Sequence, residues 1–382
     1  MASCGSRFVS GWNRERSTRC GGDRRRHRGI AHAIEAADRG LSVALIERDD
    51  PPVGASIRNF GHACVTAQAG DGRRRALRAR ERWLELAARA GFWAGETGTV
   101  VVARAADELA VLHELAAIRG PAEVELLDAS EVRSRVGSAA PDIVGGARFR
   151  LDLRVNPREA AHSLLRWLAG RPGVAVRTGE HVVAVEPGVV RTNRATLRAR
   201  RIVVAVNHDV DRLFPDLAAQ HGVRRCWLQM LRVAAPGDRR VVPGVLSGFS
   251  LLRYAAFGEC GSLGAVRARL TAESPLAIEA DLNLMFTQLP DGDLLLGDTH
   301  GRGTTIDPFC SEAWFELVLA EGARLLGVEG LAVRERWQGV YASAPEEFLV
   351  AEPMEGVTVA SVTSGIGMTT GFGLAAEVAD GW

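Results

Sequence analysis

The segment Gly29–Asp50, GIAHAIEAADRGLSVALIERDD, constrains the fold of this chain more than any other. Its first half carries apolar residues at helical spacing and ends on Gly40, a residue suited to a helix C-cap. LSVALIE then follows as a short apolar run typical of a buried strand. A helix followed at once by a buried strand is typical of a parallel sheet covered by helices, so we expect an α/β fold.

The acidic residue at the end of this strand, Glu47, indicates what the unit binds. In dinucleotide-binding folds, a carboxylate about 20 residues after the glycine-rich turn accepts hydrogen bonds from the adenosine ribose. Glu47 and its neighbour Arg48 stand at that place relative to Gly29. A Glu after a strand is also common on protein surfaces, so the interpretation depends on the helix and strand before it.

The residues before Gly29 do not fit such a unit, which needs a buried strand and a glycine-rich turn. Cys20–Arg28, CGGDRRRHR, supplies one Asp, four Arg and a His instead. If the arginines from Arg19 to Arg28 use CGN codons, a shift of one nucleotide permits DVVVIGAGIV directly before Gly29. A compensated frameshift would therefore explain residues 1–28. The alternative is a genuine basic arm that is solvated or disordered.

Composition limits the function classes. A chain of 382 residues exceeds one ordinary core, and 47% apolar with 24% charged residues is typical of a globular enzyme. The net charge of +1 gives no reason to expect nucleic acid or an anionic membrane as partner. We see no apolar run of about 18 residues and no signal peptide, which predicts a cytoplasmic protein. The six cysteines show no metal-ligand spacing, so we predict free thiols and no metal site.

The rest of the chain divides into helical ends and a middle rich in strands. Arg73–Gly91 predicts an amphipathic helix, and Asn156-Pro157 is a good start for another. Between Cys226 and His300 we expect the strands CWLQMLRV, FSLLRY, LNLMFTQL and DLLLGDTH. After a helix near Trp314–Leu326, the C-terminus reads as strand, glycine-rich turn and helix. The C-terminus is therefore expected to return to the first domain.

With the first strand restored, the chain resembles the D-amino-acid oxidase superfamily of FAD-dependent amine oxidoreductases, which includes glycine oxidase and sarcosine oxidase. The resemblance extends from Gly29 to nearly the last residue. It is closer still to the branch associated with phosphonate catabolism. The blocks that carry it are VGASIRNFGHACVTAQ (Val53–Gln68), RVNPREA (Arg154–Ala160), CWLQMLR (Cys226–Arg232), SGFSLLRY (Ser247–Tyr254), GDTH (Gly297–His300), ERWQGVYASAP (Glu335–Pro345) and TSGIGMTTGFGLAAEV (Thr363–Val378).

The resemblance implies an FAD-binding Rossmann-like parallel sheet domain and an antiparallel-sheet substrate domain. The first would comprise residues 1–80, 145–225 and 335–382, and the second residues 81–144 and 226–334. In relatives a glycine follows the strand RIVVAV, whereas this chain has Asn207, a residue that tolerates left-handed backbone angles. The residues expected to contact FAD are Gly29, Glu47, Arg48, Gly54, Ala55, Ser56, Arg58, Asn59, Gly61, Val183, Gly365, Ile366, Gly367, Met368 and Thr369.

These cofactor contacts have physical reasons. The small residues Gly54–Ser56 would let backbone N–H groups approach the pyrophosphate, with Arg58 and Asn59 toward the flavin. The glycine-rich turn from Gly365 would run along the isoalloxazine, and the following helix would stabilise negative charge on it. Val183 would meet the adenine. An ordinary polar loop and a plain strand-to-helix turn are the alternatives.

The implied reaction is oxidation of the C–N bond of a small amine bearing an acidic group, with hydride transfer to flavin N5 and electrons passed to O₂ or another acceptor. An arginine suits a carboxylate or phosphonate because its planar fork donates two hydrogen bonds. Arg253 and Tyr254 are the leading substrate anchors, and we expect only one to reach the ligand because neighbours on a strand face opposite ways. The other catalytic candidates are His62, His300, Gln338 and Tyr341, for each of which a structural hydrogen bond is the alternative.

Two other functions stay open at the level of sequence. The printed chain would place arginines where a central strand is needed, at a cost of several kcal/mol, and would then be an inactive or unstable product lacking the glycine-rich turn. An NAD-dependent dehydrogenase could share the first unit. The substrate, the covalent or non-covalent attachment of the flavin and the oligomeric state are not predicted.

Overall fold

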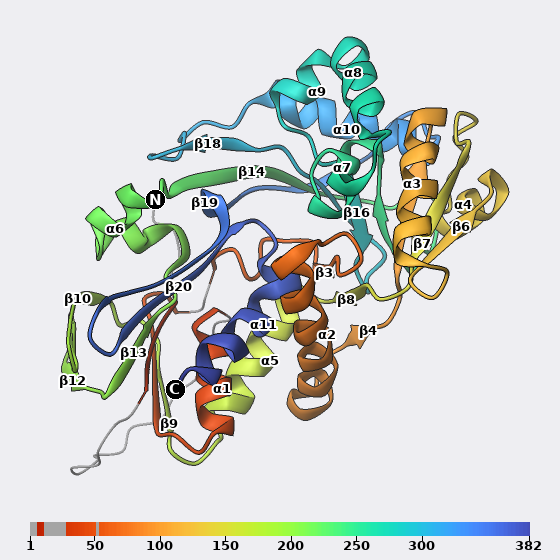
Figure 1. The fold of residues 1–382 in the computed structure, drawn as a ribbon. Helices are drawn as coiled ribbons and strands as arrows, with labels where there is room; N and C mark the ends of the chain where they lie inside the picture. Colours follow the sequence, from red (N-terminus) through yellow and green to blue (C-terminus); the bar gives the residue numbers. More distant parts are fainter. Residues whose placement is uncertain (1–5, 11–27, 51–52) are drawn as a thin grey trace.

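A large mixed sheet crosses the molecule in the computed structural model, which describes residues 6–10, 28–50 and 53–382 (Figure 1). Most pairs on one side are antiparallel, whereas β2 pairs with β9 and β13 with β20 in parallel. In spatial order its strands are β6 (Val124–Leu127), β7 (Gly145–Phe149), β5 (Thr99–Ala103), β15 (Gly244–Leu246), β16 (Met285–Gln288), β17 (Leu294–Gly297), β14 (Arg224–Val233), β19 (Val333–Met354), β20 (Val357–Ser364), β13 (Arg201–Val204), β1 (Ser6–Ser10), β2 (Val43–Glu47) and β9 (Val174–Arg177), with β18 (Gly301–Gly303) beside β14.

Two small sheets lie beside the large one. The first is formed by β10 (Val182–Glu186), β11 (Val189–Thr192) and β12 (Thr196–Arg198). The second places β8 (Leu153–Val155) between β3 (His62–Ala63) and β4 (Ala94–Gly95). Because β3 starts at His62, this second sheet fixes the backbone of a predicted site residue.

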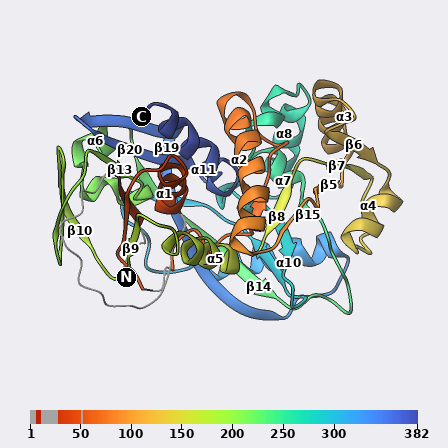
Figure 2. The same cartoon turned by 90° about the horizontal axis from the view of Figure 1, so that it is seen from below.

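The helices form two groups, as Figures 1 and 2 show. The first group packs together although it comes from both ends and the middle of the sequence: α1 (Arg28–Asp38), α2 (Gly70–Ala90), α5 (Pro157–Ala169) and α11 (Gly367–Asp380). The second belongs to the other half: α3 (Ala106–Arg119), α4 (Ala129–Val136), α7 (Gly248–Leu251), α8 (Leu263–Glu273), α9 (Pro275–Glu279) and α10 (Glu312–Leu326). α6 (Pro215–Gln220) and 3₁₀ turns at Asn207–Arg212 and Ala255–Glu259 complete the helices that the structure describes.

The helix–strand unit predicted from Gly29 onward is confirmed. Gly29 is buried in the first turn of α1, and all five residues of β2 are buried. Gly40 has φ +75°, the left-handed conformation expected of a residue that ends a helix. The predicted return of the C-terminus is also confirmed, since β20 pairs with β13 in parallel and α11 packs against α1.

The place next to β2 is occupied by a strand from earlier in the chain. Only the frame-corrected sequence was expected to put a parallel strand from residues 19–28 there, and in the structure β1 lies between β2 and β13 and is antiparallel to both. Antiparallel pairing still satisfies the backbone hydrogen bonds of both neighbours, so the sheet stays continuous. Residues 19–27 lie outside the described residues, and the frameshift hypothesis therefore stays a prediction.

The predicted strand FSLLRY is wrong, because Gly248–Leu251 is the short helix α7. The backbone N–H of Ser247 donates to Ser250 Oγ at 3.4 Å, and both serine hydroxyls donate to the carbonyl of Leu284. These local hydrogen bonds favour a helical turn over a strand. The expectation that only one of Arg253 and Tyr254 reaches the ligand rested on that strand and loses its basis.

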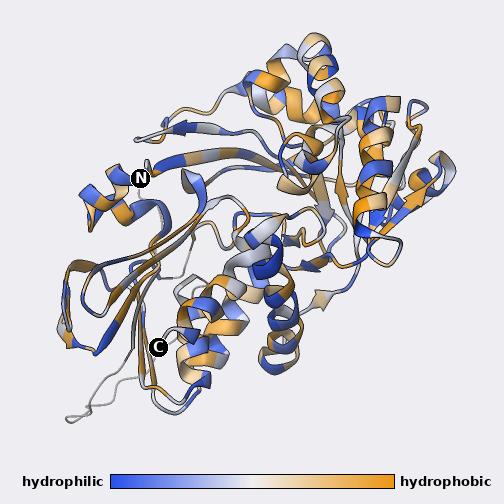
Figure 3. Cartoon of the chain, in the orientation of Figure 1, coloured by the Kyte–Doolittle hydropathy of each residue, from blue (hydrophilic) through white to orange (hydrophobic). Residues whose placement is uncertain are grey.

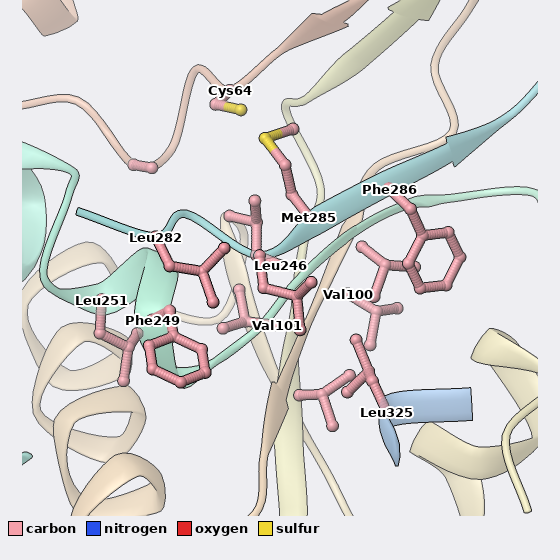
Figure 4. Packing of buried hydrophobic residues seen from close by; sticks show 14 of the residues in the cluster. Cys64, Val100, Val101, Leu246, Phe249, Leu251, Leu282, Met285, Phe286 and Leu325 are labelled. Atoms are coloured by element: carbon pink, nitrogen blue, oxygen red, sulfur yellow. The ribbon is translucent and has the colours of Figure 1, made fainter. Parts of the chain in front are cut away.

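The largest apolar core lies under the antiparallel part of the sheet. Figure 4 shows Cys64 and Met285 at one edge of this core, with Phe249 and Leu251 of α7 packed nearby. Hydrophobic and hydrophilic residues share most helices in Figure 3, as expected for helices with one face on a sheet. In the described part of the chain, no helix combines the length and apolarity that crossing a membrane requires.

Candidate active site

A cavity lies between the start of α11 and the strands β14, β16 and β19. Most of the predicted site residues line it, although they come from five separate stretches of the sequence. The predicted residues in its wall are Ala55, Ser56, Arg58, Asn59, His62, Arg253, Tyr254, His300, Tyr341, Gly365, Ile366, Gly367, Met368 and Thr369.

The loop before β3 is folded by the side chain of Asn59. Asn59 Nδ2 donates to the carbonyls of Ala55 and Ser56, and its Oδ1 accepts from the N–H of Gly61 at 2.7 Å. Gly61 has φ +66°, and a Cβ there would lie 2.0 Å from the carbonyl oxygen of Val155. Only glycine fits this position, and the loop is therefore held against β8.

The turn between β20 and α11 brings backbone close to the cavity. Gly365 has φ +82°, and a Cβ there would lie 2.9 Å from Tyr341 Cζ and 3.0 Å from Arg253 Nη2. Trp83 of α2 holds the start of α11, because its Nε1 donates to the carbonyl of Met368 at 2.8 Å. The turn thus presents the N-terminal N–H groups of a 14-residue helix beside the cavity.

Arg253 is a partly buried cation in the cavity wall. Its Nη2 donates to Tyr341 Oη at 2.9 Å and to the carbonyl of Ser364 at 2.8 Å. In the described part of the chain it forms no ion pair with a carboxylate, and its Nε and Nη1 donate to no protein group. The N–H groups of Nε and Nη1, which point in different directions, are therefore available to a bound molecule.

Tyr254 lines the same cavity but contacts sulfur atoms. Its hydroxyl lies 3.6 Å from both Cys64 Sγ and Met285 Sδ. Burial raises the pKa of the Cys64 thiol well above its usual range, so Cys64 remains a neutral thiol. The backbone N–H of Cys64 donates to Thr369 Oγ1 at 3.1 Å, which ties the end of β3 to α11.

Asp298 and His300 form the polar end of the cavity. Asp298 Oδ1 accepts from Asn283 Nδ2 at 3.2 Å, and burial raises the pKa of Asp298 to about 7. His300 Nδ1 lies 2.7 Å from the carbonyl of Asp281. Burial and the nearby charge of Arg253 lower the pKa of His300 to about 3, so its imidazole is neutral at ordinary pH.

Asn207 fills the turn where relatives were expected to have glycine. It has φ +58°, which confirms that asparagine tolerates this conformation here. Its Oδ1 accepts from the backbone N–H of Ala342 at 2.9 Å. Glycine could not form this bond, so Asn207 also links the end of β13 to β19 beside Tyr341.

Some predicted residues lie outside the cavity wall, namely Gly29, Glu47, Arg48, Gly54, Gly61, Val183 and Gln338. Val183 is 54% exposed on the small β10–β12 sheet. The side chain of Gln338 points away, toward the carbonyl of Asp307 at 3.5 Å and Cys310. Its backbone carbonyl accepts from Arg58 Nη1 at 3.2 Å, so Gln338 positions the loop rather than the cavity.

Several residues of the wall were not among the predicted site residues. Asp298 and Cys64 stand inside the blocks GDTH and VGASIRNFGHACVTAQ, next to residues that were predicted. His32 stands on the apolar face of α1, where burial lowers its pKa to about 4. A histidine among apolar residues of a helix was the available signal for it.

The profile of the family described as FAD dependent oxidoreductase matches residues 29–381 of this chain. The chain belongs to this family. FAD is therefore its cofactor, and the NAD-dependent alternative is set aside. No curated protein matches the chain significantly.

Solved structures share the fold of this FAD-dependent oxidoreductase. Glycine oxidase from Geobacillus kaustophilus is 20% identical with a TM-score of 0.72, over 92% of this chain and 91% of that chain. L-proline dehydrogenase from P. horikoshii is 17% identical with a TM-score of 0.72, over 92% of this chain and 90% of that chain. Iminodiacetate oxidase from Chelativorans sp. BNC1 is 18% identical with a TM-score of 0.72, over 93% of each chain. At these identities the likeness concerns the fold.

The described residues fit FAD. The Gly365 turn leaves no room for a Cβ, as needed where backbone approaches a flat ligand. Beyond the end of β2, Arg48 Nε and Nη2 are buried and have no hydrogen-bond partner in the described part of the chain. Glu47 is also buried there, at 1% exposure. Anionic groups of a dinucleotide would accept from these arginine donors.

Proposed function

We propose that this FAD-dependent oxidoreductase oxidises the C–N bond of a small amine that carries an acidic group. The observation that supports this most is the partly buried guanidinium of Arg253 in the cavity wall, which has no carboxylate partner in the described part of the chain. Withdrawing such a charge from water without a counter-ion costs free energy. A carboxylate or phosphonate that accepts from Nη1 would offset that cost through charge-assisted hydrogen bonding.

The surroundings of Arg253 orient such an acid. Tyr341 Oη and the carbonyl of Ser364 both accept from Nη2, so the guanidinium plane is fixed before any ligand binds. Because Gly365 packs against the same Nη2, the acid would lie close to the start of α11. A fixed anchor places the remainder of a small amine at one position, which is the main requirement of this reaction.

Bound FAD supplies the hydride acceptor for such a reaction. Gly365, Ile366, Gly367, Met368 and Thr369 would hold its flavin by backbone contact, with Arg58 and Asn59 on the opposite loop. The α11 N-terminus would stabilise negative charge on that ring. Glu47 and Arg48 would hold the adenosine half, and Val183 would contact the adenine.

The acid could be a phosphonate or a carboxylate. The sequence blocks resemble the branch associated with phosphonate catabolism, which favours an aminophosphonate. Among the proteins of similar fold, the names glycine oxidase, L-proline dehydrogenase and iminodiacetate oxidase favour amino acids. We place the aminophosphonates first, because seven blocks in order carry that resemblance. The reduced flavin would pass its electrons to O₂ or another acceptor.

The test is a substrate screen that follows flavin bleaching without oxygen. Aminophosphonates, D-amino acids, glycine and sarcosine are compared with the matched amines that lack the acidic group. Arg253→Met should lower kcat/KM for the best acidic amine by about 100- to 1000-fold, because it truncates one partner of a buried charge pair. The same substitution should change kcat/KM for the matched neutral amine little. Bleaching by no amine would overturn the proposed function, and equal losses on both amines would make Arg253 structural.

A further inference from the structure

We propose that Asp298 and His300 bind the amino group of the substrate, while Arg253 holds the acidic group at another point of the same cavity. The inference rests on the proposed function, because it assigns the amine-binding residues of that site and limits the substrate to primary and secondary amines. All three residues line the cavity. The two atoms that would receive the amine, Asp298 Oδ2 and His300 Nε2, lie 3.9 Å apart.

One carboxylate oxygen of Asp298 is bound by the protein and the other is not. Oδ1 accepts from Asn283 Nδ2 at 3.2 Å. Oδ2 accepts no hydrogen bond from another residue in the described part of the chain, and it is not among the unpaired polar atoms closed off from solvent there. The Asp298 side chain is 7% exposed and borders the cavity. Oδ2 is therefore open to a molecule in the cavity.

The tautomer of His300 follows from its one side-chain hydrogen bond. Nδ1 lies 2.7 Å from the carbonyl oxygen of Asp281, which can only accept, so Nδ1 carries the ring proton. Since the ring is neutral at ordinary pH, Nε2 carries a lone pair. Nε2 has no hydrogen-bond partner in the described part of the chain and is not among its closed-off polar atoms either. Nε2 is therefore a second acceptor beside Asp298 Oδ2.

The spacing of the two acceptors indicates which donor they suit. At 3.9 Å they are too far apart to share a hydrogen bond, but a nitrogen with two N–H groups fits between them at about 2.9 Å from each. A protonated primary amine has three N–H groups and a protonated secondary amine has two, whereas a protonated tertiary amine has one. The pair therefore selects primary and secondary amines.

The charges of the cavity favour a zwitterion. Arg253 and Asp298 both border it, yet no ion pair joins them in the part of the chain that the structure describes. Burial raises the pKa of Asp298 to about 7 while Arg253 opposes that rise, so its carboxyl group is ionised above pH 7. An ammonium group at Asp298 and an acid at Arg253 would supply the counter-ion that each of these residues lacks.

The other ionisable groups near Asp298 leave it as the anion of the cavity. Asp281 lies outside the cavity wall and accepts from Arg302 Nη2 at 2.5 Å. Burial raises the pKa values of the neighbouring thiols and phenols, so they stay neutral near pH 7. These groups are Cys64, Cys226, Tyr254 and Tyr341.

The test uses ligands that share one carbon skeleton and carry no hydrogen on the carbon bound to nitrogen, so that this C–N bond cannot be oxidised. 2-Aminoisobutyrate carries both charges, pivalate only the acid and tert-butylamine only the amine. Calorimetric titration of full-length, FAD-loaded protein at pH 8 gives Kd for each ligand and for the phosphonate counterparts. We expect 2-aminoisobutyrate to bind about 10- to 100-fold more tightly than pivalate, the scale of a hydrogen bond to a charged group.

Two variants assign this preference to one carboxylate. Asp298→Asn should remove the preference for 2-aminoisobutyrate and leave pivalate binding unchanged, because it removes the charge but keeps the acceptor for Asn283. Asp281→Asn is the matched control, since this carboxylate lies beside the same histidine but outside the cavity wall. Equal binding of the two ligands to the unsubstituted protein, or equal losses in D298N and D281N, would overturn the proposal.

The pH dependence is measured on the unsubstituted protein and does not depend on the folding of D298N. Because the ionised carboxylate binds the ammonium group, the preference for 2-aminoisobutyrate over pivalate should fall about 10-fold between pH 8 and pH 6. A constant preference would show that Asp298 does not bind the amine.

The number of acceptors is tested with methylated ligands. The N,N-dimethyl derivative of 2-aminoisobutyrate has one N–H group when protonated, so it should bind about 10-fold more weakly than the N-methyl derivative, which has two. Equal binding of the two derivatives would remove His300 from the proposed amine site.

These outcomes separate the two proposals. If tert-butylamine binds only when Asp298 is present and pivalate does not bind, the amine site stands and the acid anchor of the proposed function fails. If pivalate binds and the amino group adds no affinity, the role of Asp298 fails and the anchor at Arg253 stands.

Discussion

Arginine serves two different purposes in the two halves of this molecule. In the helical layer, Arg82 of α2 donates to Glu35 and Asp38 of α1 and to Glu85 on its own helix, at 2.5–2.8 Å. In the cavity, Arg253 has no carboxylate partner in the described part of the chain. Paired arginines hold helices together, and an unpaired, partly buried arginine is available to a ligand.

The carboxylates show the same contrast in their pKa values. Hydrogen bonds from Arg75 lower the pKa of Glu377, on α11, to about 2. Burial raises the pKa of Asp298, in the cavity, to about 7. Charges that the fold leaves uncompensated therefore lie where the proposed function needs a charged molecule to bind.

The largest expected effect on cofactor binding concerns a third group of arginines, Arg24–Arg26 and Arg28, which precede the buried Gly29. Replacing residues 19–28 by DVVVIGAGIV should increase FAD affinity by about 100-fold. The reason is that a glycine-rich turn adds backbone N–H contacts to the pyrophosphate, each worth about 1–1.5 kcal/mol. Titration of the apoprotein with FAD, followed by flavin fluorescence, measures this.

The control for this replacement changes the same arginines to glutamine, which removes their charge without creating the strand. If the glutamine variant gains as much affinity as the replacement, charge and not the turn is responsible. If neither gains, the basic segment is a native arm and the frameshift hypothesis is wrong.

The sequence predicted the local units well because their signals are local. Apolar spacing, Gly40 and Gly365 specify α1, β2, β20 and α11 without help from the rest of the chain. The segment SGFSLLRY was harder, because its apolar run suits a strand or a buried helix equally. Hydrogen bonds of Ser247 and Ser250 to Leu284, distant in sequence, decided for the helix.

The site was predicted as a set of residues and not as an arrangement. Blocks of resemblance identified Arg253, Tyr341 and His300, which the fold brings together. The raised pKa of Asp298 depends on burial of its carboxyl group by other strands. The hydrogen bond from Thr99 Oγ1 to Asp152 Oδ2 likewise depends on two segments that are distant in sequence. Neither leaves a pattern in the sequence.

An effect of similar size in free energy is the pH dependence of stability due to Asp298. Because its folded pKa of about 7 lies above the usual aspartate value, the folded protein retains a proton that the unfolded chain loses between about pH 4 and 7. The free energy of unfolding should therefore fall as pH rises through this range, by on the order of 2–4 kcal/mol at 1.4 kcal/mol per pKa unit.

Asp298→Asn should remove most of this slope while keeping the acceptor for Asn283. Denaturant unfolding at pH 5 and pH 8 measures it. The sign is opposite for Glu377, whose lowered pKa adds stability that is lost as pH falls from about 4.5 to 2. If the free energy of unfolding of D298N changes with pH as in the unsubstituted protein, Asp298 is ionised in the folded protein. The contrast between the pKa values of Asp298 and Glu377 would then be wrong.

A comparable effect is expected when an acid without an amine occupies the cavity. Methylphosphonate or propionate at 100 times its Kd should raise the free energy of unfolding by about 2.7 kcal/mol. Arg253→Met should abolish the rise, and Arg82→Met should leave it intact, since Arg82 lies in the helical layer. Thermal shift at several ligand concentrations measures it, and a rise that survives in R253M would place the acid elsewhere.

The smallest effect tests the paired arginines themselves. Arg82→Met removes the arginine that Glu35 and Asp38 share and leaves Glu35, whose side chain is only 6% exposed, with Arg39 and Asp38 with Arg89 and Arg171. We expect a loss of about 1–3 kcal/mol of unfolding free energy with kcat unchanged, because the charges left behind are partly buried. Arg74→Met is the matched control on the same helix. The Arg74 side chain is 58% exposed, so its ion pair with Glu377 should contribute nothing measurable to the free energy of unfolding. If R82M and R74M behave alike, the difference between the two halves lies in ligand binding alone, and arginine pairing does not stabilise the helical layer.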